Sequence, residues 1–142
     1  MRLQSAVFSV EDAVVGREDV NKVLSILKME GVWLYAVTAM ERAEAEAALA
    51  EAGAAEFFRG VLTERETKCP LDGAAIYEKA MRRLQSTPRD TVVFTGRLAA
   101  LRGAKAAGVR VAAVAGAAEA DEWAAMRAEA DEIVARYADF LA

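Results

Sequence analysis

Short apolar runs alternate with stretches of helical periodicity along this chain. The apolar runs predict strands at residues 3–10, 32–38, 57–62, 91–95 and 109–114, and a short edge strand at 132–135. Strand-length apolar runs that alternate with helices are typical of a parallel sheet buried on both faces.

Helical patterns separate these runs. Helices are expected at residues 19–30, 41–52, 72–84, 98–107 and 119–130, and the last residues are expected to form a fraying or docking helix. Gly31, Gly53 and Gly108 each follow an expected helix, where glycine readily adopts the left-handed conformation that ends one. Asp72 is expected to cap the helix that begins after it.

The pattern therefore predicts an α/β fold, a three-layer sandwich with a mainly parallel, five- or six-stranded Rossmann-like sheet. No repeat and no linker interrupts the 142 residues, so we expect a single domain over residues 1–142. Ligands of such sheets bind at the carboxyl ends of the strands. The residues just after Phe8, Val37 and Phe94 are thus the first candidates for a site.

Composition narrows the range of functions. The formal net charge of -4 gives no reason to expect a nucleic-acid partner. No leader and no apolar run of about 20 residues is present, so we expect a cytoplasmic protein without a membrane partner. The single cysteine, Cys69, cannot form an internal disulfide. The absence of histidine excludes a Ser-His-Asp triad, a Cys-His pair and histidine metal ligands.

Four segments near the expected strand ends carry the candidate chemistry. They are residues 6–12 (AVFSVED), 36–38 (AVT), 68–72 (KCPLD) and 92–97 (VVFTGR), the last followed by 101–109 (LRGAKAAGV). In this order they resemble the motifs of the haloacid dehalogenase-like (HAD) hydrolases, especially the phosphoglucomutase-like and phosphoglycolate phosphatase-like branch. The resemblance covers nearly the whole chain.

The resemblance implies a role for each position. In that family an aspartate at the end of the first strand attacks phosphorus, and an aspartate two residues later is the general acid and base; these positions hold Ser9 and Glu11. The residue that binds the phosphoryl group corresponds to Thr38, and the lysine that neutralises charge around the nucleophile corresponds to Lys68.

The acids that hold magnesium in active relatives are replaced here by Thr95, Gly96 and Arg97. Magnesium needs hard oxygen ligands, usually with one or two carboxylates, and Ser9 and Gly96 offer only a hydroxyl and no side chain. We therefore expect no tight magnesium site and no cofactor. A serine hydroxyl is a weak nucleophile without a base, and the only local bases are carboxylates, so no residue is assigned as catalytic.

Other interpretations of these residues stay open. One hypothesis places Arg97 in the vacated cation site, with its guanidinium paired to Glu11. Thr38 could equally cap the next helix. Glu11 and Asp12 would ordinarily be turn residues, and Lys68 would ordinarily be a solvated surface lysine.

The expected connections are too short for the cap domain that many relatives carry. Residues 12–32 accommodate one helix, and residues 38–68 accommodate a helix and a short strand. Capless relatives tend to act on large substrates such as proteins or to gain a lid from a neighbouring subunit.

Three functions follow. The first is a pseudoenzyme that binds a protein partner, its own copy, or a small anion held by Thr38, Lys68 and Arg97. The alternative is a phosphomonoesterase in which Ser9 or Glu11 has been recruited into an altered mechanism. A receiver domain of the response-regulator type is the third, but it needs an aspartate after the third strand, and residues 63–65 (TER) contain none.

Overall fold

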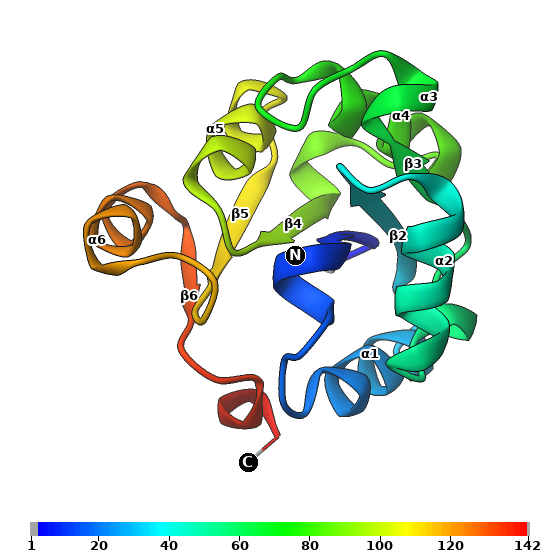
Figure 1. The fold of residues 1–142 in the computed structure, drawn as a ribbon, viewed down its shortest axis with the longest axis horizontal. Helices are drawn as coiled ribbons and strands as arrows, with labels where there is room; N and C mark the ends of the chain where they lie inside the picture. The colour runs from blue at the N-terminus through cyan, green and yellow to red at the C-terminus, as the bar shows by residue number, and fades with distance from the viewer. Residues whose placement is uncertain (1–2, 142) are drawn as a thin grey trace.

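The computed structural model describes residues 3–141, which form one parallel sheet between two layers of helices (Figure 1). The sheet order is β3-β2-β1-β4-β5-β6, and every neighbouring pair is parallel. The strands are β1 (Ser5–Ser9), β2 (Trp33–Thr38), β3 (Val61–Thr63), β4 (Thr91–Thr95), β5 (Arg110–Val114) and β6 (Glu132–Val134). The predicted fold class is confirmed.

The helices connect these strands in the expected alternation. They are α1 (Val20–Met29), α2 (Arg42–Glu51), α3 (Glu64–Thr67), α4 (Ala75–Leu84), α5 (Leu98–Ala106) and α6 (Ala120–Glu129). Shorter turns are the π-helical η1 (Val10–Val14) and the 3₁₀ turns η2 (Ala55–Phe57), η3 (Pro88–Asp90) and η4 (Tyr137–Phe140). Within residues 3–141, no helix combines the length and the apolar character needed to cross a bilayer.

The period-two alternation of the strands divides the core into two layers. On one face, Phe8 and Phe94 stack with ring centroids 4.3 Å apart, and α1, α2 and η4 cover them. On the other face, Val7 and Val93 pack against α4, α5 and α6. Figure 1 shows these helices on opposite sides of the sheet. The central strands are buried on both sides, which is why they consist almost entirely of apolar residues.

Several local predictions were wrong. Residues 57–60 do not belong to the third strand: Phe57 ends a 3₁₀ turn, and strand β3 begins at Val61. Asp72 does not cap α4, whose N-cap is Ala74 and lacks a side-chain hydrogen bond. Helix α3 was not expected from the sequence. At its start, the hydroxyl oxygen of Thr63 accepts the backbone N–H of Glu66 at 3.0 Å.

Candidate functional site

The candidate site lies where the carboxyl ends of β2, β1 and β4 meet. Because β1 lies between β2 and β4, the chain segments that follow these strands are brought side by side. Ser9 is the last residue of β1 and pairs with Val37, while Thr38 and Thr95 end the two flanking strands. The topology thus unites three of the four motif segments found in the sequence.

The turn η1 determines where the acidic residues point. It follows β1 directly and closes with a hydrogen bond from the N–H of Val15 to the carbonyl of Val10, 3.0 Å long. Val10 and Val14 are buried in the core that η1 shares with α1. Burial of these apolar residues fixes the turn, and Glu11 is left facing β2 while Asp12 faces β4.

Glu11 bridges η1 to the end of β2. The hydroxyl of Thr38 donates to its Oε1 at 2.9 Å, and the backbone N–H of Ala39 donates to its Oε2 at 2.9 Å. The Thr38 oxygen also accepts the N–H of Met40 at 3.0 Å, before α2 begins at Arg42. Thr38 is therefore not the N-cap of α2, and its hydroxyl proton is given to a carboxylate of the same chain.

Asp12 makes the corresponding bridge to β4. Its Oδ1 accepts the backbone N–H of Gly96 at 2.8 Å and the hydroxyl of Thr95 at 3.3 Å. The side chain is 5% exposed. Glu11 and Asp12 do lie in a turn, as expected, since both belong to η1. Beyond that expectation, both carboxylates cross-link neighbouring strand ends.

Ser9 occupies the position of the family's nucleophile without the contacts that a nucleophile needs. Its hydroxyl is buried and has no hydrogen-bond partner within residues 3–141. Neither Glu11 nor Asp12 bonds to it, because the hydrogen-bond partners of both carboxylates lie on β2, β4 and the loops after them. Among the described residues, no base forms a hydrogen bond with the Ser9 hydroxyl.

Arg97 does not fill the vacated cation site. Its Nε donates to Glu122 Oε2 at 2.9 Å, and the N–H of Leu98 donates to the same oxygen at 2.8 Å. The hydrogen bond from Arg97 lowers the pKa of Glu122 below its ordinary value. The predicted pairing of Arg97 with Glu11 is therefore wrong. The guanidinium of Arg97 pairs instead with Glu122, which lies on α6 and is distant in sequence.

Lys68 lies apart from these contacts. It is exposed and adopts the left-handed conformation with φ of 58°, and its ammonium group forms no hydrogen bond or ion pair with the described residues. No hydrogen bond joins any two of Thr38, Lys68 and Arg97 in residues 3–141. Joint anion binding by these three residues stays a prediction.

The magnesium that active relatives would bind does not fit these residues. Gly96 offers no side-chain ligand, and a Cβ added there would lie 3.0 Å from the carbonyl oxygen of Asp12 and 3.2 Å from that of Val114. The carboxylate of Asp12 is already engaged by a backbone donor. Over residues 3–141, no three His, Cys, Asp or Glu side chains come together as a possible metal site.

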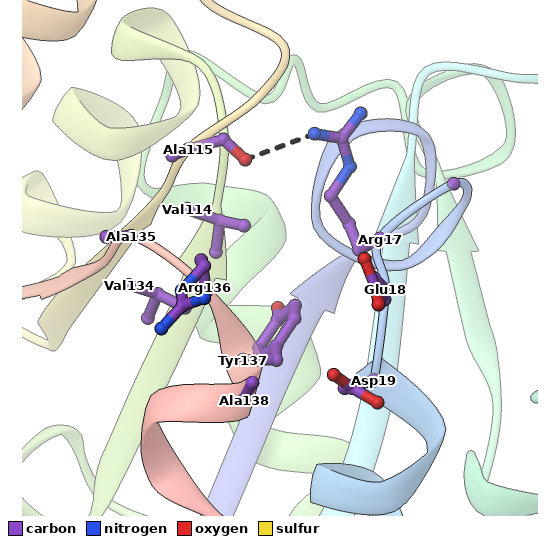
Figure 2. A pocket seen from close by; sticks show the side chains of 11 residues that line it. Arg17, Glu18, Asp19, Val114, Ala115, Val134, Ala135, Arg136, Tyr137 and Ala138 are labelled. Carbon is purple, nitrogen blue, oxygen red and sulfur yellow. Dashed lines mark hydrogen bonds between the residues drawn. The ribbon is translucent and has the colours of Figure 1, made fainter.

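A cavity lies at the same edge of the sheet, beside β5 and β6, and has a volume of about 170 Å³. Figure 2 shows Arg136 on one side of it and Glu18 with Asp19 on the other. Arg17 donates to the carbonyl of Ala115 at 3.1 Å. Sequence reasoning missed this cavity, because only the folded path of the loop at 16–19 places these residues opposite the C-terminal turn.

Comparison with known proteins finds similarity to haloacid dehalogenase-like hydrolases in both sequence and structure. A profile of haloacid dehalogenase-like hydrolases matches residues 3–108. A search of curated proteins by sequence finds no match. Among solved structures, a candidate β-phosphoglucomutase from Thermotoga maritima is 23% identical, with a TM-score of 0.74 over 83% of this chain and 55% of that one.

Two further structures agree. A predicted phosphoglycolate phosphatase from Haemophilus somnus is 18% identical, with a TM-score of 0.77 over 88% of this chain and 55% of that one. The core domain of a candidate phosphoglycolate phosphatase from Streptococcus pneumoniae is 14% identical, with a TM-score of 0.74 over 99% of this chain and 94% of that one. The chain spans little more than half of the first two structures and nearly all of the isolated core domain.

Proposed function

Because the chain belongs to the haloacid dehalogenase-like hydrolase family, we propose that it is a non-catalytic member, which works by binding a protein partner or a second copy of itself. One observation carries the proposal. The hydrogen-bond donors at the ends of β2 and β4 are already satisfied by the carboxylates of Glu11 and Asp12. The places where a phosphoryl group and its cation would be held contain fixed negative charge instead.

Electrostatics makes this arrangement unfavourable for phosphoryl transfer. Two like unit charges about 4 Å apart near a protein surface repel each other by about 4 kcal/mol. A phosphate monoester at these strand ends would face Glu11 and Asp12 without a divalent cation to offset the repulsion. Enzymes of this kind depend on positive groups placed where charge develops. The ends of these strands therefore favour neither the substrate nor the transition state.

The small anion suggested by the sequence is a weaker ligand candidate than a protein. Thr38 gives its proton to Glu11, and Arg97 is held by Glu122. An incoming anion would have to displace a carboxylate from each of them. A protein partner requires no such displacement. The direct connection from η1 to α1 through residues 15–19 also leaves the strand ends without a cap from that segment.

The alternative function is a phosphomonoesterase with an altered mechanism. The observation in its favour is the hydroxyl of Ser9, which is buried at the nucleophile position and lacks a partner in the described chain. It would need a base, and the nearest candidates by sequence, Glu11 and Asp12, are both hydrogen-bonded elsewhere. We therefore rank this function second.

An activity assay separates the two functions. The purified protein is incubated with p-nitrophenyl phosphate and magnesium, and release of nitrophenol is followed against a protein-free blank. We expect no release above the blank. Turnover that Ser9→Ala abolishes, and that the matched variant Ser25→Ala on helix α1 retains, would establish the phosphomonoesterase and overturn the proposal.

A further inference from the structure

A cavity at the opposite, amino edge of the sheet combines a tryptophan with two arginines. Its volume is about 320 Å³. Its lining residues come from the segment before β1, the start of β2, the segment before β3 and the end of α4: Gln4, Trp33, Arg59, Arg83, Leu84 and Gln85. The carboxyl-edge site of Ser9, Glu11 and Asp12 contributes none of them, so this cavity is separate from the site described above.

Trp33 is unusually accessible for the first residue of a buried strand. Its side chain is 46% exposed, whereas the other five residues of β2 are buried. The guanidinium carbon of Arg59 lies 3.5 Å from the centre of the indole ring. This cation–π contact holds Arg59 in place and orders both side chains before any ligand arrives. Preordered side chains lose less conformational entropy on binding.

The charge of the cavity is positive and uncompensated. None of its lining residues carries a carboxylate. Within the part of the chain that the structure describes, neither Arg59 nor Arg83 forms an ion pair. Elsewhere on the surface, five arginines each pair with an acid: Arg42, Arg65, Arg97, Arg102 and Arg136. The cavity is thus a local positive site on a chain whose net charge is -4.

The end of helix α4 does not cancel this charge. Arg83 lies in the last turn of α4, and Gln85 is its C-cap. A helix C-terminus carries about half a negative charge, spread over its last carbonyl groups. Arg59 and Arg83 together carry two full positive charges. The net field in the cavity therefore attracts anions.

We propose that this cavity binds an acidic segment of a partner protein, with an aspartate or glutamate held between Arg59 and Arg83 and an apolar side chain against Trp33. Tryptophan and arginine are the residues that most often dominate the energy of protein interfaces. A nucleic acid is disfavoured, because its many phosphates would meet the net negative charge of the rest of the chain. The proposal rests on the binding role proposed above and names the surface and the partner's chemistry.

The test uses a short synthetic peptide of alternating glutamate and leucine, and the same peptide with glutamine in place of glutamate. The chain has two tryptophans, so Trp123→Phe makes Trp33 the single fluorescent reporter. We expect saturable quenching by the glutamate peptide, weaker at higher salt, and about tenfold weaker binding of the glutamine peptide. Equal binding of the two peptides, or no saturable quenching, overturns the proposal.

The two neighbouring arginines of α4 provide a matched pair of variants. Arg83→Ala is expected to weaken binding of the glutamate peptide about tenfold. Arg82→Ala removes the same charge from the next exposed residue, which does not line the cavity, and is expected to change binding by less than about twofold. Equal losses of peptide affinity in the two variants would show that only the overall charge of the protein matters, and would overturn the proposal.

Mapping on the unmodified protein makes the test independent of variants. Amide chemical shifts are compared with and without the glutamate peptide. The largest changes are expected at Trp33, Arg59 and residues 83–85. Largest changes at the Ser9 edge, or tighter binding of a single-stranded oligonucleotide at the same salt concentration, contradict the proposal. The phosphatase assay is unaffected by these outcomes, so failure here is distinguishable from failure of the proposed non-catalytic role.

Discussion

At the scale of single residues, two adjacent carboxylates dominate this molecule. Glu11 and Asp12 are consecutive, yet they bind to different neighbours of β1. A buried backbone N–H that loses its acceptor costs more than an average hydrogen bond contributes, because the group stays desolvated. The stability of the strand ends should therefore depend on Asp12 more than its position in a turn would suggest.

Asp12→Ala is expected to lower the free energy of unfolding by roughly 1–3 kcal/mol, because the buried N–H of Gly96 loses its acceptor. Asp12→Asn keeps an acceptor oxygen and should lose less. Urea denaturation measures both. Glu18→Ala, at an exposed residue of the next loop, serves as the control. Similar losses in Asp12→Ala and Glu18→Ala would show that the bridge contributes little.

The contact between Glu122 and Arg97 predicts that the stabilisation contributed by Glu122 is lost in acid. The hydrogen bond from Arg97 lowers the pKa of Glu122 from its ordinary 4.5. A lowered folded-state pKa stabilises the protein above the unfolded value, and this stability is lost as the pH falls through the folded value. Glu122→Gln should thus cost less than about 1 kcal/mol at pH 7 and nothing in stronger acid.

Urea denaturation of the wild type and of Glu122→Gln between pH 7 and pH 3 checks this prediction. The two curves should converge as the pH falls through the lowered folded-state pKa of Glu122, which lies below 4.5. In an Arg97→Ala background the neutral-pH difference should shrink, because the largest cause of the pKa shift is gone. A difference that persists unchanged in acid contradicts the assignment.

At the scale of elements, close packing of α5 holds the loop before α4. Gly103 on α5 is buried, and a Cβ there would contact the carbonyl oxygen of Leu71 and lie 2.7 Å from the carbonyl carbon of Asp72. These are backbone atoms, which cannot turn aside as a flexible side chain can. The glycine therefore permits the close approach of this loop to α5.

Gly103→Ala is expected to destabilise the fold by roughly 1–3 kcal/mol, since overpacking exceeds the gain in helix propensity of up to about 1 kcal/mol. Gly73→Ala is the matched control, because a Cβ there meets nothing closer than 3.8 Å. Thermal or urea unfolding of both variants measures the difference. Comparable stability of the two variants would show that the loop shifts without cost.

Most elements could be predicted from sequence, and the exceptions share a cause. The central strands and the main helices have strong periodicity, so their positions were found within a few residues. The turn η1 was missed because five residues are too few to show a period. Its conformation follows from the burial of Val10 and Val14 and from bonds to β2 and β4, which are long-range contacts.

The candidate site was predictable in its members and not in its pairings. Ser9, Glu11, Thr38, Thr95 and Gly96 do gather at one edge, because a parallel sheet brings strand ends together. The partner of Arg97 could not be read from sequence, because Glu122 lies on α6 and reaches the site only after β5 is in place. Nothing in the spacing of Trp33, Arg59 and Arg83 indicated that they line one cavity.

At the scale of the whole molecule, two buried tyrosines bind backbone carbonyl groups, one far away in the sequence and one nearby. The hydroxyl of Tyr137 donates to the carbonyl of Ala13 at 2.8 Å, and that of Tyr77 donates to the carbonyl of Leu71 at 2.7 Å. Burial raises the pKa of both hydroxyls well above the ordinary 10. Each tyrosine therefore stays protonated in the folded state when it ionises in the unfolded chain.

This difference predicts loss of stability in alkali. Stability is fully present below pH 10 and falls above it by about 1.4 kcal/mol per pH unit for each such tyrosine. Tyr137→Phe should cost about 1 kcal/mol at neutral pH through the lost hydrogen bond and should make the alkaline slope shallower by one tyrosine's share. Urea denaturation of the wild type and of Tyr137→Phe from pH 9 to pH 12 measures both slopes. Equal slopes for the two proteins would contradict the assignment.

The two outermost strands, β3 and β6, have three residues each. Edge strands this short present few unpaired backbone N–H and C=O groups. Natural proteins use short edge strands to prevent edge-to-edge aggregation. Another polypeptide can therefore form few backbone hydrogen bonds with these strands, so it gains little by adding a strand to the sheet. Recognition between this molecule and others should depend on side chains, and the protein should resist assembly into cross-β fibres while it stays folded.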